Sequence, residues 1–405
     1  MSGARVSRNT STRLGAVDGD LVVEARGRVE VEGRLIVSGE IRCEGDATFS
    51  GPVEARSLRT DDGEVAVQGD LSVKEDLVAR DGSVRVDGAL AAGSVDVDRR
   101  LQVAGPARAT SFEVGGRLEG GSTLEGERVA VGGRLALAGK LTAQKVEVGG
   151  SLDSGEVDLD RLEAGGSADV KGGRVRTSIE VGGRFGSSAP ITFGTLEVGG
   201  MVSLAPGSTG RRIEVGGKLS GDGDLAFDAL EVGGLATIEG NGRGGSVEVG
   251  GHLGVRRSLR LSGKAEVGGS LEVGEAFEGV DLEVGGRLQA ARAVCTGTAE
   301  VGGSVATRDG LKANRLRLHR RASASGPLVG TEVELGSRAR VEDVYGESVR
   351  LDDRTEARNV QARRVRVGDD VRVTTLLYTE SFEGGRDLQA ASPPKKVDKL
   401  DSFPL

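Results

Sequence analysis

One phrase, Val-x-Val-Gly-Gly-x-Leu, recurs along the middle of this chain at intervals of 16 to 18 residues. The stretch from Arg128 to Leu152 contains two copies, 17 residues apart. One position of the phrase is filled in turn by Val131, Val148, Ala164, Val181, Val198, Val215, Val232, Val249, Val267, Val284 and Val301. So constant a period is typical of a protein built from stacked repeats rather than from separate globular domains.

Within one period the apolar residues come in pairs separated by one position. In the unit that starts at Arg128 these pairs are Val129 and Val131, Leu135 and Leu137, and Leu141 and Ala143. Such alternation is typical of short β-strands that bury one face. Three strands in each period of about 17 residues therefore predict one turn of a three-faced parallel β-solenoid.

The same pattern predicts where the solenoid begins and ends. We expect a flexible N-terminal tail over residues 1–20, one all-β solenoid over 21–382, and a flexible C-terminal tail over 383–405. Within the solenoid we expect turns of six-residue repeats over 21–111, Gly-Gly turns over 112–303 and Arg-rich turns over 304–382. About twenty turns at a strand spacing of about 4.8 Å predict a rod on the order of 100 Å long.

Composition agrees with a repeat fold and excludes several other classes. Gly accounts for 68 of 405 residues, aromatic residues for 2% and apolar residues for 37%, which is little material for several globular cores. A disordered chain, in turn, would lack regularly placed Val and Leu. The formal net charge of −8 gives no indication of a nucleic-acid-binding protein.

The chain is expected to be cytoplasmic. It has no run of 18 apolar residues, and its first twenty residues lack the apolar core of a secretory signal. The two cysteines, Cys43 and Cys295, lie far apart in the repeat array, so we expect no disulfide.

Motifs for catalysis or metal binding are missing from the sequence. His252 and His319 are the only histidines, and neither belongs to a cluster with metal-ligand spacing. No nucleophile elbow, phosphate-binding loop or dinucleotide-binding glycine motif occurs between a strand and a helix. We therefore expect no enzymatic activity, no catalytic residue, no cofactor and no metal.

Twelve consecutive turns, from Gly115-Gly116 to Gly302-Gly303, carry a glycine pair at the same corner. Because Gly tolerates positive φ, the pair is expected to form a tight corner and to leave a ridge without side chains. Two interpretations stay open: corner geometry alone, or a flat surface for lateral contact. The glycine candidates for that contact are Gly149, Gly150, Gly182, Gly183, Gly199, Gly200, Gly216 and Gly217.

Outward-pointing glutamates are expected to stack into a column. Its members are Glu147, Glu163, Glu180, Glu197, Glu214, Glu231, Glu248, Glu266, Glu283 and Glu300. Like charges about 4.8 Å apart repel, so the column needs counter-charge, which we expect from Arg117, Arg134, Arg184, Lys218 and Arg287. A solvated face, a divalent-cation ladder and a docking stripe are the open interpretations, and Glu180, Glu197, Glu214 and Glu231 are the lateral-contact candidates.

The block from Ser304 to Val373 loses the glycine pairs and gains arginine. Its fifteen Arg and Lys residues outnumber its eleven Asp and Glu residues, which leaves a local charge of +4. This block is either a salt-bridged solvent-exposed surface or a contact for an acidic partner, including the glutamate column of another molecule.

The stretches "VEVEGRLIVSGEIRCEG" and "VRVGDDVRV" resemble the bactofilin family of polymer-forming cytoskeletal proteins. The resemblance implies a right-handed three-faced β-helix that assembles end to end, without nucleotide, into filaments. It also implies other cytoskeletal or cell-envelope proteins as partners, and membrane contact through the N-terminal tail with Arg5, Arg8 and Arg13. This chain departs from the family in its length, about three times that of a usual bactofilin core, and in its Gly-Gly turns.

By the same resemblance, apolar residues of the terminal turns are the candidates for end contact. They are Leu376, Tyr378 and Phe382 at the C-terminal end and Leu21 and Val23 at the N-terminal end. The aromatic pair could equally cap the core of one molecule. The leading hypothesis is a self-assembling cytoskeletal scaffold; the alternatives are a non-polymerising strut that binds partners along its side and a β-helix acyltransferase.

Overall fold

The computed structural model describes residues 3–400, which form β-strands and no helix. The strands pair in parallel and stack as a β-solenoid of about 23 turns with about 17 residues in each turn. The predicted fold class is therefore confirmed, with three turns more than the sequence pattern indicated. No helix within this part of the chain has the length and apolarity needed to cross a membrane.

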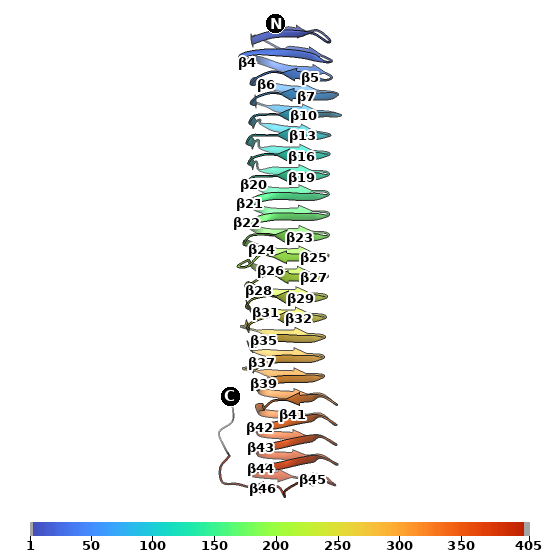
Figure 1. Ribbon diagram of the computed structural model, residues 1–405, viewed down its shortest axis with the longest axis vertical. Coiled ribbons are helices and arrows are strands. Elements are labelled where there is room, and N and C mark those ends of the chain that lie inside the picture. The colour runs from blue at the N-terminus through green and yellow to red at the C-terminus, as the bar shows by residue number, and fades with distance from the viewer. Residues whose placement is uncertain (1–2, 401–405) are drawn as a thin grey trace. The chain divides into compact units, whose positions relative to one another are not determined.

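The chain divides into two compact units, unit 1 over Met1–Gly200 and unit 2 over Met201–Leu405. In unit 1, one turn consists of β18 (Arg128–Val131), β19 (Arg134–Leu137) and the first residues of β20 (Leu141–Val148). The rest of β20 begins the next turn, and its Val146 and Val148 lie in register with Val129 and Val131. Figure 1 shows successive strands of this unit stacked above one another.

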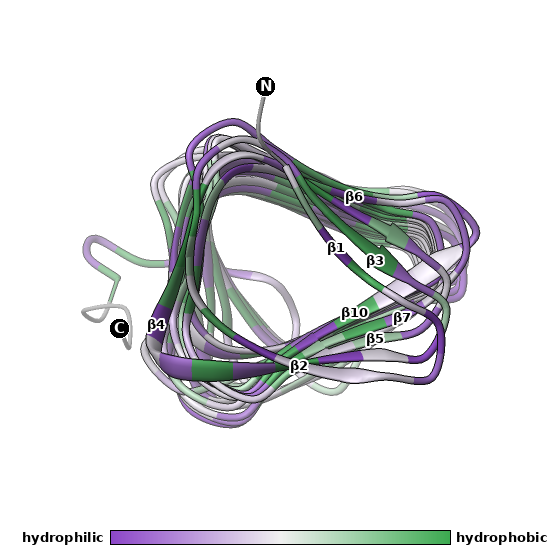
Figure 2. Cartoon of the chain, turned by 90° about the horizontal axis from the view of Figure 1, so that it is seen from above, coloured by the Kyte–Doolittle hydropathy of each residue, from purple (hydrophilic) through white to green (hydrophobic). Residues whose placement is uncertain are grey.

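Each turn has three sides, as the view along the stack shows (Figure 2). The apolar pairs of the turns are buried inside. All six residues predicted to point inward between Val129 and Ala143 are buried, with at most 6% of their surface exposed. Large side chains fill the same interior in other turns, among them Phe112 and Phe185. The alternating pattern thus becomes a continuous column of stacked apolar side chains, because residues one turn apart lie directly above one another.

The N-terminal boundary differs from our expectation. Residues 4–17, which we assigned to a flexible tail, contain β1 (Ala4–Val6) and β2 (Ser11–Val17). These strands pair in parallel with β3 (Leu21–Glu24) and β4 (Gly27–Glu44), respectively. The first turn is harder to recognise in the sequence because small or polar residues, such as Ala4 and Thr12, take inward positions next to Val6 and Leu14.

Unit 2 repeats the arrangement of unit 1 in its Gly-Gly turns. One turn consists of β31 (Ser246–Val249), β32 (His252–Val255) and β33 (Leu259–Leu261). The next turn begins with β34 (Lys264–Val267), whose Ala265 and Val267 lie in register with Val247 and Val249.

The Arg-rich turns of unit 2 have a wider corner in place of the Gly-Gly pair. Four residues, His319 to Ala322, connect Leu318 to Ser323, and the following turns repeat this length. The third corner residue has a left-handed backbone, with φ near 60°, in Arg321, Arg338, Arg354 and Asp370. The fourth is buried in each case, as Ala322, Ala339, Thr355 and Val371. Each of these corners thus buries one additional side chain, and the smooth glycine ridge is absent.

The C-terminal boundary also differs from our expectation. β44 (Arg372–Glu383) is followed by β45 (Gln389–Ala390) and β46 (Lys395–Lys396), both within the expected tail. These two short strands pair with Arg372–Val373 and Leu377–Tyr378 of β44. Residues 401–405 of the expected tail lie outside the described residues.

Candidate interaction surfaces

The predicted glutamate column exists in each unit. In unit 1, Glu147, Glu163, Glu180 and Glu197 are neighbours in register on successive turns. In unit 2 the same holds from Glu214 through Glu231, Glu248, Glu266 and Glu283 to Glu300. The four glutamates that we named for lateral contact are exposed or half-buried and therefore accessible to a partner.

The counter-charges of this column are not the ones that we expected. Lys145 lies 2.7 Å from Glu147 and 3.0 Å from Glu163, so one amine bridges two turns. Hydrogen bonds from Lys145 and then from Arg128 hold the pKa of the Glu147 carboxyl below its usual value. In unit 2, Lys264 bridges Glu266 and Glu283 at 2.8 and 3.0 Å in the same way.

Among the expected counter-charges, Arg117 pairs with Glu119 at 3.2 Å, and Arg184 pairs with Asp169 at 2.8 Å. Arg134 lies 3.8 Å from Asp153, and Arg287 donates a hydrogen bond to Ser304. These residues follow the corner and sit on the next face, whereas Lys145 and Lys264 precede their glutamates on the same strand. Strand alternation places residues two positions apart on the same face. The pairing of Lys145 and Lys264 with the glutamate column could therefore have been predicted from the sequence.

The glycine pairs are needed for a reason other than the one that we gave. None of the paired glycines has φ in the left-handed region. Instead, a Cβ on Gly149 would lie 2.2 Å from the carbonyl oxygen of Gly132, one turn earlier. A Cβ on Gly150 would lie 2.5 Å from the corresponding oxygen of Gly133. Successive corners are therefore stacked so closely that no side chain fits between them. The glycines that we named for lateral contact are exposed or half-buried.

Adding one methyl group at this corner should destabilise unit 2. A Cβ on Gly250 would lie 2.4 Å from the Gly233 carbonyl oxygen, so Gly250→Ala should cost about 1–3 kcal/mol of unfolding free energy. Gly221→Ala is the matched control, since its nearest neighbours lie 3.8 Å away, and it should be neutral or stabilising by up to about 1 kcal/mol. Urea unfolding of the full chain measures both. Equal midpoints for the two variants would show that corner stacking is not what requires glycine.

At the N-terminal end, two of our end-contact candidates are wrongly placed. Leu21 and Val23 are fully buried, with Ala4 and Val6 on one side and Ile41 and Cys43 on the other. They cannot meet another molecule, because β1 covers them. Of the arginines that we considered for membrane contact, Arg5 pairs with Glu24 at 2.7 Å, and Arg13 lies 3.7 Å from both Glu30 and Glu32.

At the C-terminal end, the candidates lie on the last long strand. Leu376 is buried, whereas Tyr378 and Phe382 are half-buried, with ring centres 5.7 Å apart. Phe382 lies in register with Val365 of the preceding turn, in β43 (Glu356–Val367). Within residues 3–400, no strand pairs with Ser381–Glu383 on the other side, because β45 and β46 cover only the earlier parts of β44. Among the described residues, one of the three sides of this turn therefore keeps an open strand edge.

The Arg-rich block is extensively paired with acids of adjacent turns. Representative distances are 2.7 Å from Arg315 to Glu332, 2.9 Å from Arg317 to Glu334, 2.6 Å from Arg358 to Asp343 and 2.6 Å from Arg366 to Glu383. These pairs favour the interpretation of a salt-bridged surface for most of the block. Each exposed pair stabilises the fold only slightly, because water and salt screen the attraction.

Each unit also has a shallow polar groove that our sequence analysis missed. The groove of unit 1 has a volume of about 490 Å³ and is lined by Arg108, Glu125, Gln144, Asp158 and Arg176, among others. The groove of unit 2, about 480 Å³, is lined by Asp224, Asn241, Arg243, Ser258 and Arg260, among others. Several polar groups of the grooves contact one another: Arg176 binds Asp158 at 2.6 Å, and Asp224 accepts a hydrogen bond from the Asn241 backbone N–H at 2.7 Å.

Groups with catalytic or ligating chemistry are scattered in the described chain. His252 Nδ1 lies 2.6 Å from the Ser270 hydroxyl, and His319 contacts the Glu300 carboxylate. Neither histidine lines either of the two grooves described above. Burial raises the pKa of each thiol, Cys43 and Cys295, to about 12. Within residues 3–400, no three His, Cys, Asp or Glu side chains are grouped so as to hold a metal ion.

Comparison of the chain with protein-family models, with curated proteins and with solved structures gives no match. Interaction surfaces must therefore be judged from their own geometry. The half-buried aromatic pair beside the open edge of β44 and the charged columns of each unit are the two features that stand out.

Proposed function

We propose that this chain is a structural protein that self-assembles end to end into nucleotide-independent filaments and acts as a cytoskeletal scaffold. The observation that carries the proposal is the half-buried Tyr378–Phe382 pair beside the open strand edge at Ser381–Glu383. An unpaired edge presents backbone N–H and C=O groups that another strand can use, and the exposed parts of the two half-buried rings add a hydrophobic contribution.

The stacking within each unit supports the same proposal. Parallel ladders join every turn to the next, so a second molecule can continue the ladder by the interactions that already hold the turns together. The N-terminal turn offers a matching surface, since within residues 3–400 β1 and β2 pair on the side that faces β3 and β4 and on no other. Its half-buried Leu14 and Ala4 are apolar.

Phe382→Arg tests this proposal, because a charge at the end contact must be desolvated when two molecules meet. We expect wild-type protein to form filaments in negative-stain images without nucleotide. The variant should need a concentration about ten-fold higher or more, equivalent to about 1.4 kcal/mol of lost contact free energy. Sedimentation velocity over a concentration series measures the concentration at which each protein assembles.

Val280→Arg is the matched control, since Val280 is 37% exposed on unit 2 away from the end and acquires the same charge. This control should assemble like the wild type. A wild-type protein that stays monomeric throughout the series, or a Phe382→Arg variant that assembles normally, would contradict the proposal. Single molecules that bind partners along their sides would then be the better description.

A further inference from the structure

One edge of unit 2 changes the sign of its charge along the stack. The edge consists of the strand before each Gly-Gly or wide corner, together with the corner itself. Its glutamate column ends at Glu300, and the same register continues as Arg317, Glu334, Arg350, Arg366 and Glu383. A uniformly acidic column thus becomes one with arginines at three of five positions.

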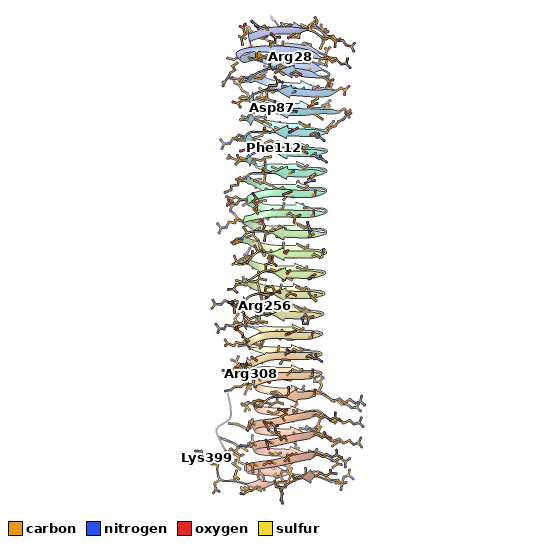
Figure 3. All side chains as sticks on the ribbon, in the orientation of Figure 1. Arg28, Asp87, Phe112, Arg256, Arg308 and Lys399 are labelled. Atoms are coloured by element: carbon orange, nitrogen blue, oxygen red, sulfur yellow. The ribbon has the colours of Figure 1, made fainter. Side chains whose placement is uncertain are left out.

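The change of sign is strongest in the two turns after Glu300. The outward residues of this basic segment are Arg315, Arg317, Arg320, Arg321 and Arg338, opposed by Glu332 and Glu334, which gives a charge of +3. The outward residues of the preceding acidic segment are Glu231, Glu248, Glu266, Asp281, Glu283 and Glu300, opposed by Lys264, which gives −5. Figure 3 shows long side chains projecting from the turns around β41 (Leu328–Leu335) and β42 (Arg340–Leu351).

Three arginines of the basic segment have no acidic partner among residues 3–400. No carboxylate oxygen of residues 3–400 lies within 4.0 Å of Arg320, Arg321 or Arg338, and all three are exposed. Arg321 and Arg338 also have left-handed backbones, with φ of 63°. Gly, Asn and Asp adopt that conformation more readily than Arg. Backbone geometry therefore does not explain arginine at these corners.

The acidic segment likewise keeps charge that its own molecule does not neutralise. Glu248 has no basic group within 4.0 Å among the described residues and is exposed. The corner beside it, Gly250-Gly251, has no side chain, so another backbone can approach closely there. A surface of opposite charge can therefore approach and bind the charged columns on this edge.

We propose that this edge of unit 2 pairs with the same edge of a second copy, antiparallel, so that the acidic segment of each molecule meets the basic segment of the other. Both columns have the strand spacing of about 4.8 Å, so successive turns of the two molecules can lie side by side. A parallel pair without an axial shift would instead place acid against acid. An antiparallel pair is isologous and closed, and each contact occurs twice. The contact uses the side of the solenoid and is independent of the end contact proposed above.

Charge reversal tests the pairing. Arg320→Glu with Arg321→Glu changes the charge of the basic segment from +3 to −1, and Glu248→Lys with Glu300→Lys changes that of the acidic segment from −5 to −1. We expect wild-type protein to pair at low salt and to lose at least ten-fold in affinity at high salt, because screened charges attract weakly. Each double variant alone should pair at least ten-fold more weakly than the wild type, and an equimolar mixture of the two should regain pairing. All measurements are sedimentation equilibrium in the Phe382→Arg background, which separates side contact from end contact.

Two controls keep the result interpretable. Arg243→Glu with Arg257→Glu makes the same change of charge at exposed positions of unit 2 off this edge, and it should pair like the wild type. Arg320→Gln with Arg321→Asn removes the charge while keeping a residue that tolerates a left-handed backbone, and it should weaken pairing even if the reversed variant misfolds.

Spin labels on Ser246→Cys report the orientation, because both native cysteines are buried. In an antiparallel pair centred between Glu300 and Arg317 the labels lie about 34 Å apart along the axis, whereas in an unshifted parallel pair that axial separation is zero. Failure of the mixture to associate, salt-independent pairing, or labels side by side would overturn the proposal.

Discussion

Replacing Phe277 by Ala should destabilise unit 2 by about 3–5 kcal/mol, the range for removing a large buried aromatic side chain. Phe277 is fully buried in β35 (Ser270–Gly279), in register with Leu259 of the turn before and Ala293 of the turn after. The small Ala293 side chain cannot fill the space that the ring leaves. The cavity would also remove contacts from both neighbouring turns, and each turn depends on its neighbours for stability.

Urea unfolding gives the size of this effect, and amide hydrogen exchange shows how far it spreads. We expect faster exchange in the turns on both sides of Phe277. Leu235→Ala is the control, because Leu235 is 36% exposed on the same unit and should change stability by only about 0.5 kcal/mol. A Phe277→Ala loss as small as that of the control would mean that the inward column does not hold the turns together.

Acid should destabilise the solenoid through its inter-turn ion pairs. A hydrogen bond from Arg358 holds the pKa of Asp343 below its usual value, and one from Arg366 does the same for Glu383. The Asn241 backbone N–H, followed by its side chain, lowers the pKa of Asp224. Because these folded-state values lie below the unfolded ones, the folded chain binds fewer protons. The stabilisation is complete above about pH 5 and is lost as the pH falls through the folded-state values.

Urea midpoints measured from about pH 7 down to about pH 2 at constant ionic strength check this sign. The midpoint should fall most steeply below about pH 4, and Asp343→Asn should make the fall shallower by removing one titrating group. A midpoint that stays constant or rises on acidification would contradict the role of the carboxylates.

The repeat and its faces were predictable because one physical rule, alternation in a strand, fixes both. Val129 and Val131 point inward for the same reason that Glu147 points outward between Val146 and Val148. The first turn was missed because Ala4 and Thr12 give it little apolar character. Nothing in the local pattern shows that β1 covers Leu21, since that contact joins residues 17 positions apart.

The surface was predictable only in part. The register of the glutamate column follows from the period, but the close stacking of Gly149 on Gly132 depends on the path of the backbone between turns. The left-handed corners at Arg321 and Arg338 have no signature in the sequence, because Arg is not a residue that favours that conformation. These left-handed positions can be identified only when the number of residues in each corner is known.

Electron cryomicroscopy of the purified full-length chain without nucleotide tests the central proposal most directly. We predict filaments in which the strand repeat of about 4.8 Å continues from one molecule into the next through the turn that carries Tyr378 and Phe382. Isolated molecules at every concentration, or filaments joined elsewhere, would contradict it.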